Sequence, residues 1–222
     1  MMNKEAPTFL FSIQHTALSF RLWRAVAAVM LSALLVMVAG CGSAAKVTRV
    51  DADVVTDLSG RWNDTDSRLV AETMVREALE SPWLGNYTRA RGRQPVVVVG
   101  TILNRSHDHI NVQTFVTDLS RELTNSQKVA FVAGKGEREE IREERREQAI
   151  HARENTQKAP GKEIGADYIL KGSISSIPDE SDGVKAMFYQ VDLEMIDLES
   201  NVKSWFGQKK IKKVIERKRV LF

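Results

Sequence analysis

The residue with the clearest chemical role in this sequence is Cys41, the only cysteine of the chain. It directly follows the small residues of Val38-Ala39-Gly40, which end an uncharged apolar run of about 15 residues. Arg21 and Arg24 stand before that run. This order is typical of a cleaved signal peptide, and the run is shorter than the roughly 20 residues that a permanent membrane helix needs. We therefore predict cleavage before Cys41, with lipid on its sulfur and amine.

The residue after the cysteine indicates the destination of such a lipoprotein. It is Gly42 rather than an aspartate, which in Gram-negative bacteria is typical of lipoproteins passed on to the outer membrane. We expect a signal peptide over residues 1–40, a lipidated cysteine with a short tether over 41–46, and a globular domain over 47–222 that faces the periplasm. The alternatives are a structural cysteine behind an ordinary signal peptide and an uncleaved anchor helix.

Three other groups of residues have types that could do chemistry, but their spacing is wrong for it. His107-Asp108-His109 offers metal-ligating side chains, yet it stands where a strand gives way to a helix and where such residues cap turns. Ser59-Gly60 lacks the glycine pattern of a nucleophile elbow, and Asp57, Asp64 and Asp66 do not form a calcium loop. We predict no metal, no cofactor and no enzyme activity.

Composition limits the partners and the number of domains. Of the 32 basic and 29 acidic side chains, three basic and one acidic lie in residues 1–40, so 29 and 28 remain after cleavage. A nearly neutral mature chain gives no reason to expect nucleic acid as a partner. Its roughly 180 residues fit one domain with a proper core, and a single cysteine allows no internal disulfide.

Two charged stretches are candidate contact surfaces. Residues 135–147 carry five basic and six acidic side chains, which predicts a solvated helix, with a partner surface as the alternative. Basic residues also gather at the C-terminus: Lys209, Lys210, Lys212, Lys213, Arg217, Lys218 and Arg219. Lysines commonly protect an edge strand from aggregation, and the alternative is attraction to anionic lipid or cell-wall polymer.

The elements that must position these residues alternate between strand and helix in the first part of the chain. Valines among polar residues predict a strand over 46–55, and Asn63 or Asp64 caps a helix to about Glu80. The Ser81-Pro82 pair stops that helix. The continuous apolar run of residues 95–99 predicts a buried, central strand. Asp108 or Asn111 then begins a second helix.

The second part of the chain ends in strands alone. The expected order is a short strand over 128–132, a charged helix over 135–154, and strands over 165–174, 187–195 and 202–214. We therefore predict an α/β fold in which a mixed or antiparallel sheet is flanked by helices.

One run of residues contains side chains that turn formation alone does not explain. Residues 57–67 read Asp-Leu-Ser-Gly-Arg-Trp-Asn-Asp-Thr-Asp-Ser, and no local structure needs Arg61 and Trp62 side by side. Together with the later Val97-Val98-Val99-Gly100 and Asn104-Arg105-Ser106, this run resembles the LpoB family over residues from about 50 to 215. The family consists of outer-membrane lipoproteins that activate bifunctional penicillin-binding proteins.

The resemblance implies a fold, a partner and a site. The fold would be similar to the N-terminal domain of TolB, and the protein would bind and stimulate a peptidoglycan synthase without being an enzyme. We expect Arg61 and Trp62, with Asn104 and Arg105, to contact the synthase, since Trp and Arg are enriched among residues that dominate interfaces. Alternatively, Trp62 packs under the first helix and Arg61 pairs with an acid.

Two other functions stay open on the sequence alone. One is a structural envelope lipoprotein that binds peptidoglycan or another envelope protein. The other is an enzyme acting on the wall, which would need a carboxylate or serine site that the sequence does not offer.

The chain departs from the family pattern in its tether. Well-studied LpoB proteins use a long, proline-rich tether to reach a synthase across the periplasm. Here about five residues separate Cys41 from the strand expected at residue 46, a reach of at most about 18 Å. That is much less than the width of the periplasm.

Overall fold

The computed structural model describes residues 46–52, 54–181 and 183–216, together with positions 23, 26, 28 and 30. The chain divides into two units, residues 1–50 and 51–222, and the helices and strands named below belong to the second. Cys41 and the predicted signal peptide lie outside the described residues, apart from those four positions. None of the described helices combines the length and the apolar character that a membrane crossing requires.

Two consecutive helices open the domain. Helix α2, Asp64–Glu80, is capped by Asn63, whose side-chain oxygen accepts from Asp66 N–H while the Asp66 carboxylate accepts from Asn63 N–H. The helix predicted from Asn63 to Glu80 is thereby confirmed. Ser81 ends α2 but also begins α3, Pro82–Arg91, which the sequence analysis did not predict. Proline suits the first position of a helix, because the N–H that it lacks has no partner within the helix at that position. The proline that ends α2 can therefore also begin α3.

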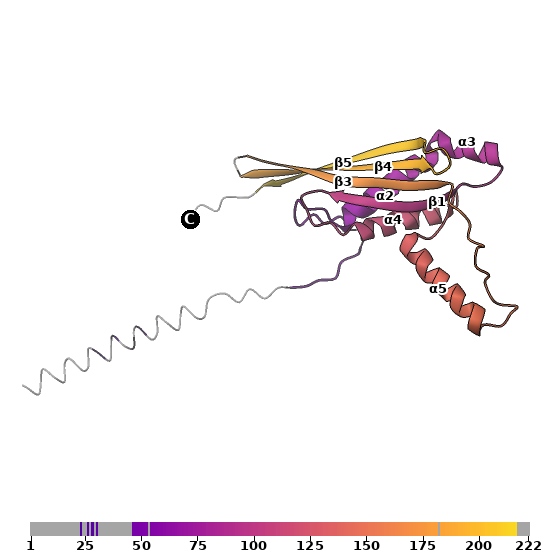
Figure 1. Ribbon diagram of the computed structural model, residues 1–222. Coiled ribbons are helices and arrows are strands. Elements are labelled where there is room, and N and C mark those ends of the chain that lie inside the picture. Colours follow the sequence, from indigo (N-terminus) through magenta and orange to yellow (C-terminus); the bar gives the residue numbers. More distant parts are fainter. Residues whose placement is uncertain are drawn as a thin grey trace, which may run out of the picture. The chain divides into compact units, whose positions relative to one another are not determined.

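Five strands form one mixed sheet (Figure 1). They are β1, Val96–Arg105; β2, Ala130–Phe131; β3, Tyr168–Ser181; β4, Val184–Asp197; and β5, Lys203–Glu216. The strand order is β2-β1-β3-β4-β5, in which β1 runs parallel to β2 and β3 while β3, β4 and β5 run antiparallel. The α/β fold with a mixed, curled sheet is confirmed, and residues 51–216 contain four helices.

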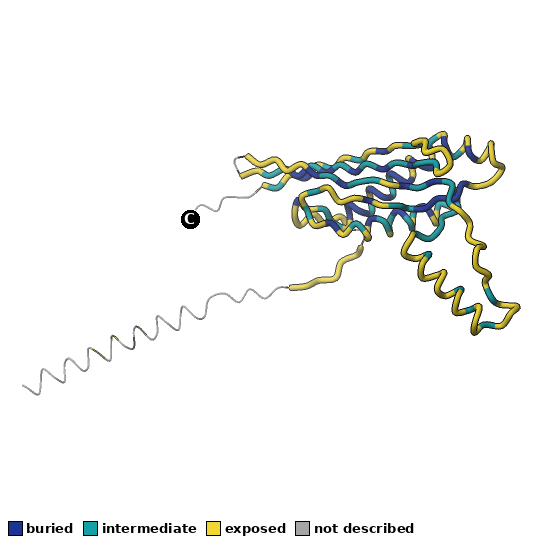
Figure 2. Tube along the Cα trace, in the orientation of Figure 1, coloured by how far each residue is buried: buried dark blue, intermediate teal, exposed yellow. Residues whose placement is uncertain are grey.

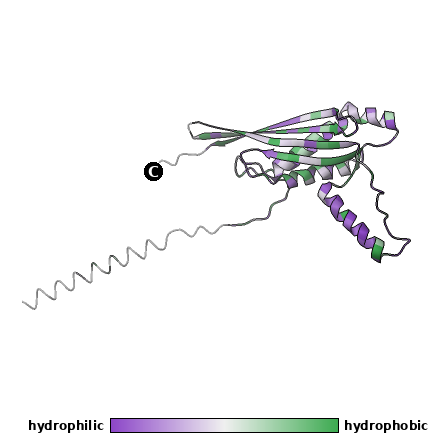
Figure 3. Ribbon diagram, in the orientation of Figure 1, coloured by the Kyte–Doolittle hydropathy of each residue, from purple (hydrophilic) through white to green (hydrophobic). Residues whose placement is uncertain are grey.

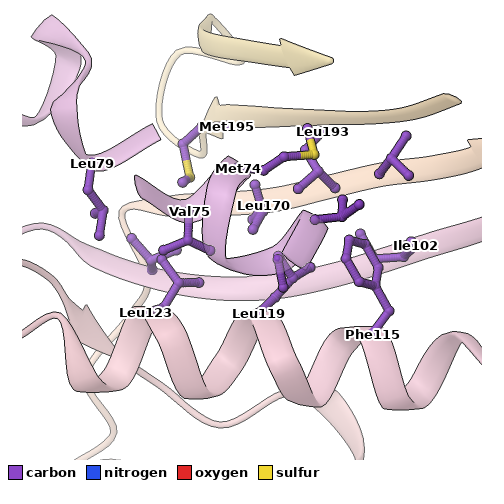
Figure 4. Packing of buried hydrophobic residues seen from close by; sticks show 14 of the residues in the cluster. Met74, Val75, Leu79, Ile102, Phe115, Leu119, Leu123, Leu170, Leu193 and Met195 are labelled. Carbon is purple, nitrogen blue, oxygen red and sulfur yellow. The ribbon is translucent and has the colours of Figure 1, made fainter. Parts of the chain in front are cut away.

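The core lies between one face of the sheet and two helices. Helix α4, Val112–Asn125, is capped by Asn111 and packs beside α2 and β1. Phe115, Leu119 and Leu123 of α4 are fully buried, and they meet side chains of α2 and the sheet such as Met74 and Leu193 (Figure 4). Along β4, every second residue from position 187 to 195 is buried and the alternate ones are half-buried (Figure 2). This alternation confirms the half-buried strand predicted there.

Three predictions about elements need correction. Residues 46–55 form no strand where the structure describes them. The strand expected over 128–132 is reduced to Ala130–Phe131. The strand after Pro95 is not fully central, because β2 pairs with only Val96 and Val97 of β1. Each difference concerns pairing, which depends on a neighbouring strand rather than on local sequence.

Helix α5, Lys135–His151, confirms the predicted charged helix and contains no buried residue. It projects from the domain (Figure 1) and is hydrophilic along most of its length (Figure 3). Arg142 and Arg145 bind Glu163 of the following loop, with nitrogen–oxygen distances of 2.8 and 2.9 Å. These two ion pairs connect α5 to the loop that follows it.

Candidate functional site

Residues 57–63, called the signature loop below, are fixed to the sheet by Lys213 of β5. Its ammonium donates to Asp66 Oδ2 at 2.6 Å, to Asp57 Oδ1 at 2.7 Å and to the Arg61 carbonyl oxygen at 3.2 Å. Lys213 is only 8% exposed, so these three acceptors replace its hydration. Burial lowers the pKa of Lys213, but the hydrogen bonds to Asp57 and Asp66 outweigh it and raise the pKa. The amine therefore stays charged.

The carboxylate of Asp57 is held from two sides. Hydrogen bonds from Lys213 and then from Asn63, whose Nδ2 lies 2.8 Å from Asp57 Oδ1, keep the pKa of Asp57 below its usual value. Asn63 thus caps α2 and ties the start of the loop to its end. The loop is a fixed part of the domain although most of its residues are exposed.

Tyr189 of β4 connects the signature loop to the turn that follows β1. Its hydroxyl contacts the Gly60 carbonyl oxygen at 3.1 Å and the carboxylate of Asp108. Burial, and next the hydrogen bond with Asp108, raise the pKa of Tyr189, so the hydroxyl remains neutral and able to donate. Gly60 lies so close to Ile215 that a Cβ added there would overlap its side chain.

The side chain of Asn104 stabilises that turn through hydrogen bonds to its backbone. Its Nδ2 donates to the Asp108 carbonyl oxygen at 2.9 Å, and its Oδ1 accepts from the N–H of Ser106 at 2.9 Å. The His107 N–H donates to Ser176 Oγ of β3 at 2.8 Å, so the turn is also bound to the sheet. Asn104 therefore acts on the site through the backbone of residues 104–108.

The signature loop and this turn enclose a cavity of about 530 Å³, called the end groove below. Its rim carries the charged residues Arg61, Lys185 and Glu180, and its floor includes Met187 and Ile215. Within the described residues, the Arg61 side chain has no hydrogen-bond or ion-pair partner, and Arg61 is exposed. An exposed guanidinium beside an apolar floor can bind a carboxylate or an aromatic ring of another protein.

The four residues predicted to bind a partner do not form one patch. Trp62 is half-buried below the loop, where its ring meets Tyr189 edge-on at 5.7 Å and Phe115 at 6.1 Å between centroids. Asn104 supports the turn. Arg105 is exposed in a different hollow that includes Lys171 and Phe206. Their role in partner binding stays a prediction, and of the four only Arg61 lies on the rim of the end groove.

Sequence reasoning missed Lys213 and Tyr189, the residues that hold the site together. A signal for Lys213 was present, because Ile211 and Ile215 stand two residues to either side of it and a strand places such neighbours on one face. Among the described residues, no group of three His, Cys, Asp or Glu side chains is arranged to hold a metal ion. Asp57, Asp66 and Asp108 instead accept hydrogen bonds from Lys213 and Tyr189.

The model of one protein family matches residues 66–211, and its description is the peptidoglycan-synthase activator LpoB. The chain belongs to the LpoB family. The matched range begins within the first turn of α2 and ends within β5, so the whole signature loop and Lys213 lie just outside it. The resemblance predicted from the sequence is confirmed, and activators of the LpoB family are generally not catalysts.

Several solved structures are similar to part of this chain. An LpoB C-terminal domain from Salmonella enterica is 17% identical with a TM-score of 0.32, covering 61% of this chain and 94% of that one. Lipoprotein GNA1162 from Neisseria meningitidis is 11% identical with a TM-score of 0.37, over 54% and 83% of the two chains. PelC from Paraburkholderia phytofirmans, a dodecamer, is 15% identical with a TM-score of 0.32, over 54% and 73%. A search of curated proteins found no match.

Proposed function

We propose that this LpoB-family protein is an outer-membrane lipoprotein, anchored through Cys41, that binds a bifunctional penicillin-binding protein and activates its synthesis of peptidoglycan. Family membership is the observation that carries the proposal. The protein acts by contact, and the chemistry belongs to the synthase. It faces the periplasm, where the synthase has its active domains.

The end groove is the contact surface we propose. Its exposed Arg61 stands on a loop that Lys213 and Tyr189 hold in place, so little conformational freedom is lost on binding. Arg61 and Lys185 suit a synthase surface that carries an acidic residue beside an apolar one. Trp62 supports this surface from below, through its contacts with Phe115 and Tyr189.

The test measures glycan polymerisation from lipid II by the bifunctional synthase of the same organism, with the full chain added in detergent. We expect a several-fold rise in rate. Arg61→Ala should abolish the rise and weaken binding about 30-fold, the effect of a 2 kcal/mol interface residue. The matched control is Arg76→Ala on α2, an exposed arginine remote from the groove, which should activate like the wild type.

Each other result assigns a different function or site. If the wild type neither binds nor stimulates the synthase, the proposal is wrong, and a structural envelope lipoprotein that binds peptidoglycan or another envelope protein takes its place. If Arg61→Ala activates fully, the synthase binds another surface, and Arg105 in its separate hollow becomes the next residue to test.

A further inference from the structure

The arginines of helix α5 gather on the side of the helix that faces the following loop. Arg138, Arg142 and Arg145 recur at the spacing of one helical face. Arg138 and Arg145 are half-buried, whereas glutamates of the opposite side, such as Glu140 and Glu144, are exposed. The nearly balanced charge of α5 is therefore divided between two faces, and the basic face is the more enclosed one.

A single carboxylate of the loop compensates these arginines. Glu163 accepts from Nε and Nη2 of Arg142 at 2.9 and 2.8 Å, and from Nη1 of Arg145 at 2.9 Å. The hydrogen bonds from Arg142 are the largest cause that keeps the pKa of Glu163 below its usual value, so this carboxylate is charged. With Arg138, three guanidinium groups face one carboxylate, which leaves an excess of about two positive charges on this side.

Several guanidinium N–H groups on this side have no acceptor in the described part of the chain. Arg138 Nε is buried and has no hydrogen-bond partner, although Arg138 is close enough to Glu163 to help lower the pKa of that carboxylate. Each guanidinium carries five N–H donors, and the structure gives the Arg145 guanidinium one hydrogen bond. Buried donors without an acceptor cost free energy, so an acceptor from outside would stabilise this face.

A cavity of about 540 Å³, called the arginine cavity below, lies beside these donors. It is lined by Arg142, Arg145, Arg146, Pro160, Gly161 and Glu163. Unlike the end groove, it has no apolar floor, and α5 is hydrophilic along most of its length (Figure 3). Guanidinium groups bind the oxygens of phosphate and carboxylate in pairs, which gives geometric specificity as well as charge. The cavity therefore suits an oxyanion rather than an apolar ligand.

We propose that the arginine cavity binds a phosphate monoester group. Such a group carries about two negative charges near neutral pH, which matches the excess on this face, whereas a monocarboxylate would compensate only half of it. Its oxygens accept from Arg145 and Arg146, while Glu163 stays bound to Arg142 and orients the cluster. The bound anion links α5 to the loop and so orders a helix that has no buried residue. The site shares no residue with the end groove and does not rest on synthase activation.

The first test measures hydrogen exchange of the α5 amides in the full chain in detergent, with and without glycerol 3-phosphate, a soluble phosphate monoester. We expect saturating glycerol 3-phosphate to slow exchange in α5 several-fold and to leave α2 unchanged. Sodium chloride at the same ionic strength is the control and should not slow exchange. Equal slowing by both salts would show an effect of ionic strength alone, and no slowing would show that the cavity holds no phosphate. Either result overturns the proposal.

A second arm of the same experiment distinguishes two sources of the group. Phosphatidic acid carries the same glycerol phosphate group on a lipid, and it is added within the detergent micelles. Protection by glycerol 3-phosphate alone supports a soluble phosphate ester as the ligand. Protection by phosphatidic acid at a lower phosphate concentration supports a lipid head group at the same cavity.

Three variants test whether the arginine cavity itself binds the group, using the glycerol 3-phosphate concentration that gives half of the protection. Arg145→Gln removes a lining guanidinium and should raise this concentration about tenfold. Glu163→Gln loosens the same helix but keeps its arginines, so it should bind at least as tightly as the wild type. Arg76→Gln, which removes an exposed arginine from α2, is the matched control for charge and should bind as the wild type does. An unchanged concentration for Arg145→Gln, or an equal rise in either of the other variants, contradicts the proposal.

Discussion

Lys213 has the largest energetic effect that we expect of any single residue at the site. It is a buried cation with two carboxylate partners, one of which, Asp66, is buried as well. Removal of the ammonium leaves Asp66 without its charged partner in a region of low dielectric. We expect Lys213→Met to lower the free energy of unfolding by about 3 kcal/mol, measured by urea denaturation.

The neighbouring residue provides the control for this prediction. Lys212→Met removes an exposed lysine from the same strand and should change the stability by less than about 0.5 kcal/mol. Equal effects of the two substitutions would show that Lys213 contributes no more than a surface charge.

Because of the Asp57 carboxylate, the free energy of unfolding should depend on pH. Its pKa lies below the usual value, so the folded state binds the proton less readily than the unfolded state. The resulting stability is present above the unfolded pKa near 4 and is lost as the pH falls through the folded pKa. We therefore expect Asp57→Asn to be less stable than the wild type at pH 6, with a difference that shrinks below about pH 4. Urea titrations at several pH values check this, and a constant difference down to pH 3 would contradict it.

At the scale of elements, local sequence predicted the helices and longer strands well. Asn63 and Asn111 cap α2 and α4 as capping chemistry requires, because the cap depends on neighbouring residues alone. The pairing of strands depends on distant residues, and there the prediction over 46–55 was wrong. The start of α3 was missed because the Ser81-Pro82 pair that ends α2 is also the pair that begins α3.

Helix α5 should be the least protected helix of the domain. It contains no buried residue, and isolated helices of its length are marginal in water. We expect its amides to exchange hydrogen faster than those of α2 and α4. Glu163→Gln weakens the contact with Arg142 and Arg145, so it should speed exchange in α5 further and leave α2 unchanged.

The matched control for α5 is Glu140→Gln. This substitution removes an exposed glutamate of the helix itself and should not speed exchange. Slow exchange throughout α5 in the wild type would show that another surface covers the helix in solution.

At the scale of the whole molecule, the site joins parts of the chain that the sequence keeps far apart. Lys213 is 156 residues from Asp57, and Tyr189 is 129 from Gly60. The family resemblance singled out Arg61 and Asn104, but not Lys213 and Tyr189, which hold the loop and the turn in place. The sequence also did not show that Arg105 lies in a different hollow, since the register of β1 is shifted between Val99 and Ile102.

The structure also changes the expected reach of the anchor. With no strand in the described part of residues 46–55, Asp57 is the first residue seen bound to the sheet, through Lys213. Extended, residues 42–56 would span roughly 50 Å from the proposed lipid at Cys41, rather than the 18 Å expected with a strand at residue 46. The reach toward a synthase therefore depends on residues 46–55.

Two variants of residues 46–55 separate the effect of the length of this segment from the effect of its sequence. Deletion shortens the tether by about 35 Å, whereas a Gly/Ser segment of equal length keeps the reach and removes the valines. We expect both to activate the synthase normally in detergent. In cells, measured by incorporation of a fluorescent D-amino acid into the wall, the deletion should lose activation and the replacement should keep it. Full activation by the deletion would show that reach is not limiting, and loss with the replacement would show that the sequence of residues 46–55, and not only its length, is needed for activation.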